Sequence, residues 1–254
     1  MERIELLQMP MDVSSMEETV TLIGDRVGRK QFTQHVVVNV AKLVNARKDA
    51  ALAQSVTACD LINIDGMGVV WGARFLGHPV AERVAGVDLF QQLLAMSARR
   101  KFPVFFLGAK PEVVEQAASV CRQQHPDLQI AGYHHGYFWD DEEAVVEKIR
   151  QSGARLLFVA ITSPLKENFI NRWRHRLGVD FVMGVGGTFD VVAGKVKRAP
   201  EWMQRAGLEW LYRVIQEPRR MWKRYLVTNS AFAWLLLQER FHYAFGSEEF
   251  GFGD

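Results

Sequence analysis

The sequence has few cysteines and no long apolar run, and both absences narrow the classes of protein to which it can belong. It contains two cysteines, Cys59 and Cys121, within segments patterned like regular structure, so we expect free thiols rather than a disulfide framework. No stretch of about 18 uncharged apolar residues is present, which argues against a membrane-spanning helix. The opening residues, MERIELLQMPMDV, lack the basic and apolar regions of a signal peptide. We therefore expect a cytoplasmic protein.

The overall charge is small but unevenly placed. The formal net charge is +2, yet nine Lys or Arg and only three Glu lie between Lys195 and Arg224. Aromatic residues are interleaved with these cations. Such a segment would suit a nucleic acid, a diphosphate or an anionic lipid surface, or it forms a solvated face that binds nothing.

Short apolar segments alternate with helical patterns as far as residue 194. We expect strands in 34–40, 59–65, 102–109 and 154–161, and at the starts of 128–138 and 180–194. We expect helices in 41–56, 87–101, 112–124, 140–153 and 163–178. Strands that alternate with helices of this length predict an α/β fold with a mostly parallel sheet and flanking helices.

The pattern changes after residue 194. Residues 195–246 contain no strand candidate and predict a basic, aromatic helical segment, which we call the C-terminal appendage; residues 247–254 have the pattern of a frayed tail. Part of the appendage, around Trp234 and Leu235–Leu237, fits a helix lying on a membrane surface, and fits equally a helix packed on the core. Exposed aromatic residues there would also allow self-association into a homo-oligomer.

The exits of the predicted strands are the places to search for a site, because ligands bind at the carboxyl ends of parallel strands. One exit, GVGGTFD (184–190), carries adjacent glycines whose backbone N–H groups would allow close approach of an anion or a sugar. Its spacing departs from the dinucleotide fingerprint, since the motif ends at Phe189 and no acidic strand end follows. A nicotinamide oxidoreductase is therefore a weak alternative.

A second exit, DGMG, begins with Asp65. An Asp before Gly is often a turn former whose side chain bonds to nearby backbone. The functional alternative is a general base at the end of a strand, where burial raises the pKa of a carboxylate. No second carboxylate stands at D-x-D spacing, so a metal role has little support.

A third exit, SPLKENF (163–169), places Ser163, Lys166 and Glu167 at the start of a helix. These residues either form a solvated helix start or contact a polar substrate.

Taken in order, these segments resemble the WecG/TagA/CpsF family of bacterial glycosyltransferases over about residues 35–240. The resemblance is carried by Asn39, by DGMGVVWGARFLG with ERVAGVDLF, by PLKENFI, and by the run from GVGGTFDVVAG through RAPEWMQRAGLEWLYRVIQEPRR to MWKRYL. It implies a Rossmann-like core (residues 1–194) of the GT-E type, followed by the C-terminal appendage.

The resemblance also implies an activity. Such enzymes are inverting transferases that move a sugar from a nucleotide-diphosphate donor, commonly UDP, onto a sugar carried by a polyprenyl diphosphate. They work on the inner face of the bacterial plasma membrane, in surface polysaccharide synthesis. We therefore expect UDP-sugar, lipid-linked acceptor and membrane surface as partners, and no nucleic acid. A non-catalytic, membrane-docked sugar-binding subunit is the alternative.

The resemblance assigns roles to residues of this sequence. Asp65 is expected to be the catalytic base, and Arg213, Arg220 and Arg224 are expected to close over the site and engage diphosphate. Because no D-x-D motif is present, we expect no required cofactor or metal. The full set of expected substrate-binding residues is Asn39, Gly66, Gly68, Arg83, Gly108, Ser163, Lys166, Glu167, Gly186, Gly187, Asp190, Arg198, Arg213, Arg220 and Arg224.

The sequence departs from the family pattern at two positions expected to touch a sugar. Val37 stands where the family often has Thr, and Lys166 stands where it commonly has Gln. The donor sugar therefore stays open among N-acetylmannosamine, its uronic acid, and glucose or another hexose.

Overall fold

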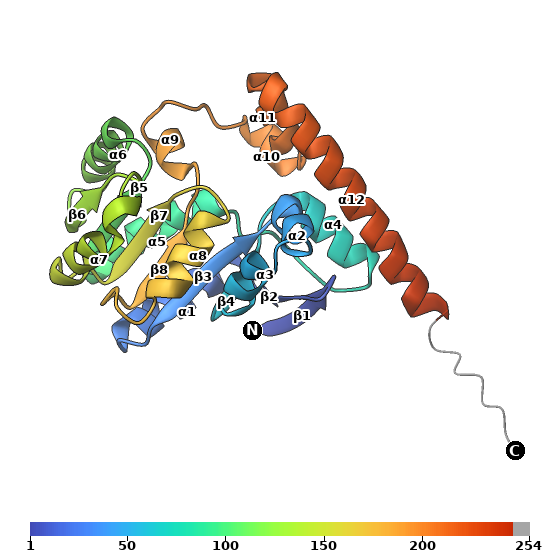
Figure 1. Ribbon diagram of the computed structural model, residues 1–254, viewed down its shortest axis with the longest axis horizontal. Helices are drawn as coiled ribbons and strands as arrows, with labels where there is room; N and C mark the ends of the chain where they lie inside the picture. Colours follow the sequence, from blue (N-terminus) through green and yellow to red (C-terminus); the bar gives the residue numbers. More distant parts are fainter. Residues whose placement is uncertain (246–254) are drawn as a thin grey trace, which may run out of the picture.

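A computed structural model describes residues 1–245 and shows one eight-stranded sheet with helices on both faces (Figure 1). The strands lie in the order β1-β2-β4-β3-β8-β7-β5-β6, and neighbours are parallel except for the antiparallel pair β1–β2. Their bounds are β1 Glu2–Leu6, β2 Met9–Val13, β3 Thr33–Val38, β4 Leu61–Ile64, β5 Val104–Gly108, β6 Ile130–His134, β7 Leu156–Ala160 and β8 Phe181–Gly184. The predicted Rossmann-like α/β fold is confirmed.

Helices fill most of the connections and make up the C-terminal appendage. Their bounds are α1 Met16–Gly28, α2 Val40–Ala46, α3 Ala50–Thr57, α4 Met67–Phe75, α5 Gly86–Arg100, α6 Pro111–Gln124, the 3-10 helix η1 Trp139–Asp141, α7 Glu142–Gln151, α8 Leu165–Trp173, α9 Thr188–Val192, α10 Glu201–Arg205, α11 Glu209–Gln216 and α12 Pro218–Phe245. The boundary at residue 194 stays a prediction, and the predicted tail (247–254) lies outside the described residues.

One local expectation was wrong. The segment 41–56 forms two helices, because Asp49 caps a new one: its side chain accepts a hydrogen bond from the N–H of Leu52 at 3.0 Å. The strand expected at the start of 180–194 is present as β8, and the short helix α9 that follows it was not predicted.

Apolar side chains cover both faces of the central strands. All residues of β5, β7 and β8 are buried, as expected of parallel strands sandwiched between helices. On the face covered by α1, α5 and α6, aromatic rings of Phe90, Phe106 and Phe158 pack together, with 4.9 Å between the centroids of Phe90 and Phe158. On the other face, α7 and α8 bury a separate cluster. The sheet is therefore a rigid platform for the side chains at its carboxyl edge.

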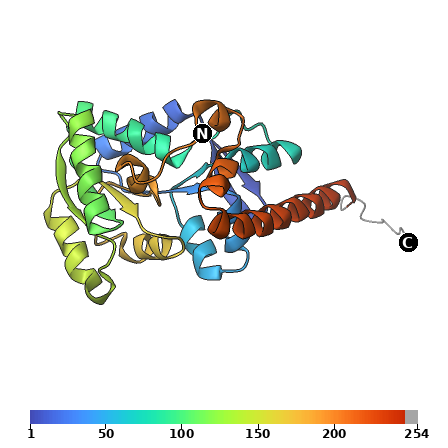
Figure 2. The same cartoon turned by 90° about the horizontal axis from the view of Figure 1, so that it is seen from above.

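The C-terminal appendage packs across this carboxyl edge. Helix α12 contacts α2 and α4, which follow β3 and β4, and then extends beyond the rest of the fold (Figures 1 and 2). A glycine allows the contact with α4, because a Cβ on Gly72 would lie 2.6 Å from Cζ of Phe232. Within residues 1–245, no helix, including α12, is long and apolar enough to cross a membrane.

Candidate active site

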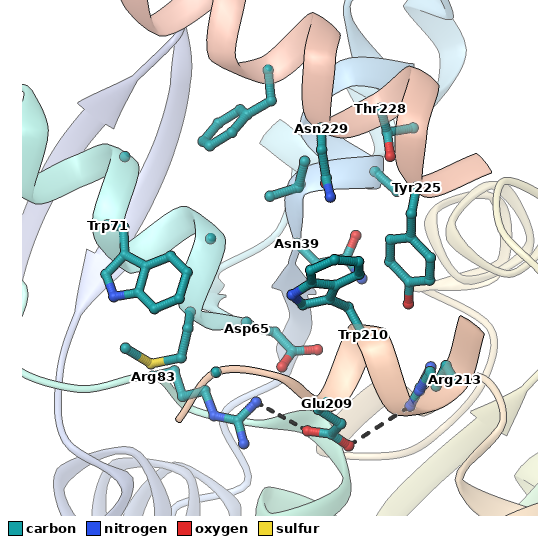
Figure 3. A pocket seen from close by; sticks show the side chains of 18 of the residues that line it. Asn39, Asp65, Trp71, Arg83, Glu209, Trp210, Arg213, Tyr225, Thr228 and Asn229 are labelled. Atoms are coloured by element: carbon teal, nitrogen blue, oxygen red, sulfur yellow. Dashed lines mark hydrogen bonds and ion pairs between the residues drawn. The ribbon is translucent and has the colours of Figure 1, made fainter. Parts of the chain in front are cut away.

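A cavity of about 640 Å³ lies between the carboxyl ends of β3 and β4 and the C-terminal appendage (Figure 3). The core lines it with residues between Asn39 and Val87, and the appendage with residues between Arg198 and Leu236. Figure 3 shows Asn39, Asp65 and Trp210 converging on this space from different elements. The cavity therefore exists only where two distant parts of the chain meet.

Asp65 lies at the end of β4 with its carboxylate in the cavity. Its backbone N–H donates to the carbonyl oxygen of Val38 at 2.8 Å, which fixes the residue beside β3. Gly66 follows with a φ of +90°, a conformation that favours glycine, and it starts α4. No described residue forms a hydrogen bond or ion pair with the carboxylate, so the turn-forming alternative has no support.

The surroundings make Asp65 a stronger base than an exposed aspartate. Burial raises the pKa of Asp65, and the nearby charges of Arg83, Arg213 and Lys42 only partly oppose this, while Glu209 adds to it. A carboxylate with a raised pKa and no partner is suited to accepting a proton from a bound hydroxyl group.

Asn39 lies next to Asp65 at the end of β3. Its Oδ1 accepts a hydrogen bond from the N–H of Lys42 at 3.0 Å and so caps α2. The cap fixes the amide group on the cavity wall. Val37, two residues earlier, does not line the cavity; a Cβ on Gly86 would meet its Cγ2 at 3.3 Å.

Glycines near the cavity serve mainly to bring helices together. Gly68 lines the cavity, but a Cβ there would lie 2.9 Å from Cγ2 of Val40, so it allows α4 to pack on α2. Gly207 has a φ of +72°, and a Cβ there would lie 2.8 Å from Cβ of Met67. The turn between α10 and α11 is thus held directly against α4, beside Asp65.

Arginines from the core and from the appendage surround one carboxylate, that of Glu209. Arg83 donates from Nη1 to Oε2 of Glu209 at 3.1 Å. Two further guanidiniums face Oε1 of Glu209: Nε of Arg198 at 3.6 Å and Nη2 of Arg213 at 4.0 Å. Arg198 also donates to Asp88, with Nη2 2.8 Å from Oδ2. This arginine cluster is the positive side of the cavity (Figure 3).

A second charged cluster, formed by Lys42, Lys166 and Glu167, lies outside the cavity. All three side chains are buried, and Oε1 of Glu167 is 2.9 Å from Nζ of Lys42 and 2.7 Å from Nζ of Lys166. Gly184 makes room for Lys166, since a Cβ there would lie 2.7 Å from Cε of the lysine. A solvated helix start is therefore wrong for these two residues of α8, whereas Ser163 is exposed.

The charged groups in this cluster shift one another's pKa values. Burial, aided by the charge of Lys42, lowers the pKa of Lys166 to about 8. Burial alone would raise the pKa of Glu167, but Lys42 and Lys166 hold it at about 2.

The structure thus brings together about half of the expected substrate-binding residues. Those that line the cavity with Asp65 are Asn39, Gly66, Gly68, Arg83, Arg198, Arg213 and Arg224. Those that do not are Gly108, Ser163, Lys166, Glu167, Gly186, Gly187 and Asp190. Arg220 lies in α12, and its side chain is outside the described part of the structure.

Sequence reasoning missed several lining residues. They are Trp71, Phe75, Glu209, Trp210, Tyr225, Asn229, Phe232 and Leu236. The aromatic ones occur at helical spacing and were interpreted as packing residues or not singled out. Glu209 stands four residues before Arg213, a spacing that indicates a helical ion pair but not that its carboxylate would face Asp65.

Comparison with known proteins identifies the family of this chain. Residues 4–245 match the model of the glycosyl transferase WecG/TagA/CpsF family, which spans almost the whole described chain. The protein belongs to this family. The resemblance seen in the sequence is confirmed, and the non-catalytic alternative gives way to a glycosyltransferase.

Two named relatives support the assignment to the WecG/TagA/CpsF family. A Bacillus spizizenii protein, named N-acetylglucosaminyldiphosphoundecaprenol N-acetyl-beta-D-mannosaminyltransferase, is 36% identical over 228 residues, covering 90% of this chain and 86% of its own. A Bacillus subtilis protein of the same name is 39% identical over 181 residues, covering 71% of this chain and 70% of its own.

Histidine, cysteine and carboxylate side chains are common protein ligands of metal ions. Among the described residues, no group of three or more of them is placed to hold a metal ion. The charged groups at the cavity are instead arginines, Asp65 and Glu209.

Proposed function

We propose that this glycosyltransferase moves a sugar from a UDP-sugar donor to a sugar on a polyprenyl diphosphate, with inversion at the transferred carbon. The observation that carries the proposal is the unpaired Asp65 carboxylate in a cavity that is ringed by arginines. The names of the two relatives make N-acetylmannosamine the first donor sugar to test and N-acetylglucosaminyl-diphosphoundecaprenol the first acceptor.

Asp65 is the proposed general base. It takes the proton from the acceptor hydroxyl as that oxygen forms a bond to C1 of the donor sugar. The bond from C1 to the diphosphate oxygen breaks at the same time, and UDP leaves with the electron pair. General-base assistance of this kind contributes roughly 10²–10⁴-fold to the rate.

The arginines are the proposed diphosphate ligands. Arg198, Arg213 and Arg224 line the cavity from the appendage, and Arg83 lines it from the core. Guanidinium groups bind phosphate oxygens through paired N–H donors, and they stabilise a leaving group that gains negative charge. We place Arg220 in the same role from its sequence position.

The donor nucleotide is proposed to extend along the carboxyl edge of the sheet towards β8 and β5. A Cβ on Gly186 would meet no atom within 4 Å, so the backbone there is open to a ligand. Gly187 and Asp190 adjoin it, and Gly108 ends β5 with a φ of +117°. Ser163, Lys166 and Glu167 are proposed to border this region from α8.

The lipid part of the acceptor is proposed to follow the apolar wall of the cavity. Trp71, Phe75, Phe232 and Leu236 form this wall where α4 meets α12. Outside the cavity, α12 exposes more than half of Trp222, Leu226 and Trp234, among basic residues. Large apolar side chains beside cations suit an anionic bilayer surface.

The proposal is tested with purified protein and a panel of UDP-sugars. Each donor is incubated with a short-chain polyprenyl-diphosphoryl N-acetylglucosamine, and both UDP release and the product mass are measured. We expect transfer from UDP-N-acetylmannosamine. Hydrolysis of the UDP-sugar without a transfer product, or no reaction with any UDP-sugar, would contradict the proposed function.

A further inference from the structure

We propose that Glu209 is a positioning residue for the transfer: it holds the guanidinium of Arg83 by a hydrogen bond, faces those of Arg198 and Arg213, and thereby leaves the Asp65 carboxylate unpaired. The inference rests on the proposed function, since it assigns Asp65 as the base. It adds a second carboxylate to the site, one that touches neither hydroxyl nor donor but sets the charge around the base.

Two carboxylates, those of Asp65 and Glu209, lie where they compete for Arg83. Both Asp65 and Glu209 line the cavity, and Arg83 is the closest to Glu209 of the three arginines in the cluster. Arg83 donates to Glu209 at 3.1 Å, and Asp65 has no such partner among the described residues. Two carboxylates facing one guanidinium compete for it, and here Glu209 holds it.

The position of Glu209 is fixed by its surroundings. The residue begins α11, where the helix dipole favours a negative charge. Directly before this helix, the backbone at Gly207 lies against Met67 and Trp71 of α4 so closely that no side chain would fit. Asp65 comes just before α4, so the two carboxylates are held at fixed positions relative to one another.

The charges around Asp65 come from several elements. Arg83, Arg213 and Lys42 act on it as cations and Glu209 acts on it as an anion, while Arg198 and Arg224 line the same cavity. Among the described residues that line the cavity, Glu209 is the one anion besides Asp65, while Glu167 pairs with Lys42 and Asp88 with Arg198 outside it. Without Glu209, Asp65 would be the one carboxylate left at the cavity, among the described residues, for Arg83 and Arg213.

Removing the charge of Glu209 should therefore have two opposite effects. Arg83 becomes free to pair with Asp65, and a neighbouring Arg lowers the pKa of an Asp by roughly one to three units. The base is weakened, so kcat should fall roughly tenfold. The cluster also becomes more positive, so a diphosphate should bind roughly fivefold tighter. Weaker turnover with tighter anion binding is not expected of damage to the fold.

The experiment compares Glu209→Gln with Glu209→Asp and with Glu201→Gln. Glu201 is a matched control, because it lies in the neighbouring helix and pairs with Arg205, and both side chains are 83% exposed. The readouts are the pH profile of kcat/KM, the affinity for inorganic pyrophosphate by calorimetry, and the carbon-13 titration of the Asp65 carboxyl. The Asp65 signal is assigned by its loss in Asp65→Asn.

We expect Glu209→Gln to shift the Asp65 titration and the acidic limb of the profile to lower pH, and to tighten pyrophosphate binding. Glu209→Asp should restore both towards wild type, and Glu201→Gln should change neither. An Asp65 titration that is the same in Glu209→Gln and wild type overturns the inference. The titration needs no turnover, so a wild-type protein that transfers no sugar would defeat the proposed function but would leave this test intact.

Discussion

Gly72 of α4 and Phe232 of α12 touch so closely that a Cβ on the glycine would lie 2.6 Å from Cζ of the ring. Phe232 is buried, and it joins the apolar cluster formed around β3, β4 and α4. This contact holds the C-terminal appendage against the core and closes the cavity above Asp65.

Replacing Gly72 by Leu should separate the two helices. The larger side chain overpacks the contact, which typically costs about 1–3 kcal/mol, and the strain is relieved if α12 moves away from α4. We expect loss of most transfer activity and faster hydrogen exchange in α10–α12, with the sheet unchanged. Gly28→Ala is the control, because a Cβ there would meet no atom within 4 Å. Unchanged exchange in α12 would contradict the role of this contact.

Asp65→Asn should abolish turnover without loss of stability. The carboxylate has no partner among the described residues, so its removal breaks no contact. We expect the rate to fall by roughly 10²–10⁴-fold, while the midpoint of thermal unfolding and the affinity for UDP stay as in wild type. The exposed Asp127 offers a matched control, Asp127→Asn. Activity close to that of wild type would show that another group takes the proton.

Trp234→Ala should weaken binding to anionic vesicles and leave the fold intact. The side chain is 62% exposed, so the variant loses little packing in solution but loses an anchor that would enter the lipid interface. Burial of one such side chain accounts for roughly a tenfold change in affinity. Sedimentation with phosphatidylglycerol vesicles measures it, and Tyr137→Ala removes an equally exposed aromatic residue far from the appendage. Equal vesicle binding by wild type, Trp234→Ala and Tyr137→Ala would show that this surface of α12 is not the membrane contact.

Glu167→Gln should destabilise the protein strongly. Removing the carboxylate leaves Lys42 and Lys166 as buried, uncompensated cations, a loss of typically about 3–5 kcal/mol. The pKa of Glu167 is about 2 in the folded protein, below its ordinary value. Its contribution is therefore present above pH 4.5, and is lost as pH falls towards 2.

Urea unfolding at several pH values checks this prediction. The difference in stability between wild type and Glu167→Gln should be largest at neutral pH and shrink below pH 4.5. Glu143→Gln removes an exposed carboxylate and should change stability by no more than about 0.5 kcal/mol. A Glu167→Gln variant as stable as that control would show that the Glu167 carboxylate does not stabilise the folded protein.

His35 should make the protein sensitive to mild acid. His35 is a residue of β3; its ring is buried, and its Nε2 lies 2.9 Å from Oδ1 of Asn63. Burial lowers the pKa of His35 to about 4, so the unfolded chain binds the proton more readily between pH 6.5 and 4. Stability therefore falls as pH drops through that range, by a total on the order of 3 kcal/mol. His35→Gln should show a flatter dependence in the same unfolding experiment, and equal slopes would contradict the assignment.

Much of the core was predictable from the sequence because its signals are local. The apolar runs around β3, β5 and β7 mark buried parallel strands, and the glycine after Asp65 marks a turn at a strand end. The hairpin β1–β2 was not predicted, since β1 has no continuous apolar run: three of its five residues are charged, and only Ile4 and Leu6 are buried.

The composition of the cavity was predictable only in part. Arginines of the appendage are visible as a run of charge, but the partner of Arg83 is Glu209, 126 residues away, and no local pattern indicates that pairing. Gly68 shows the same limit: it was expected among the substrate-binding residues and lines the cavity, but the sequence does not indicate that a Cβ there would lie 2.9 Å from Cγ2 of Val40. The Arg83–Glu209 pair and the packing at Gly68 both depend on contacts between residues far apart in the sequence.

The cavity is shared between an early and a late part of the chain, and this has a consequence for protein synthesis. Asp65 and the strands around it leave the ribosome well before α10–α12, so the sheet has the opportunity to form first. Until the last helices emerge, the nascent chain carries Asp65 without the appendage that covers it in the folded protein. A chain truncated before residue 198 would carry Asp65 but none of the appendage residues that line the cavity, so we expect activity only once translation is nearly complete.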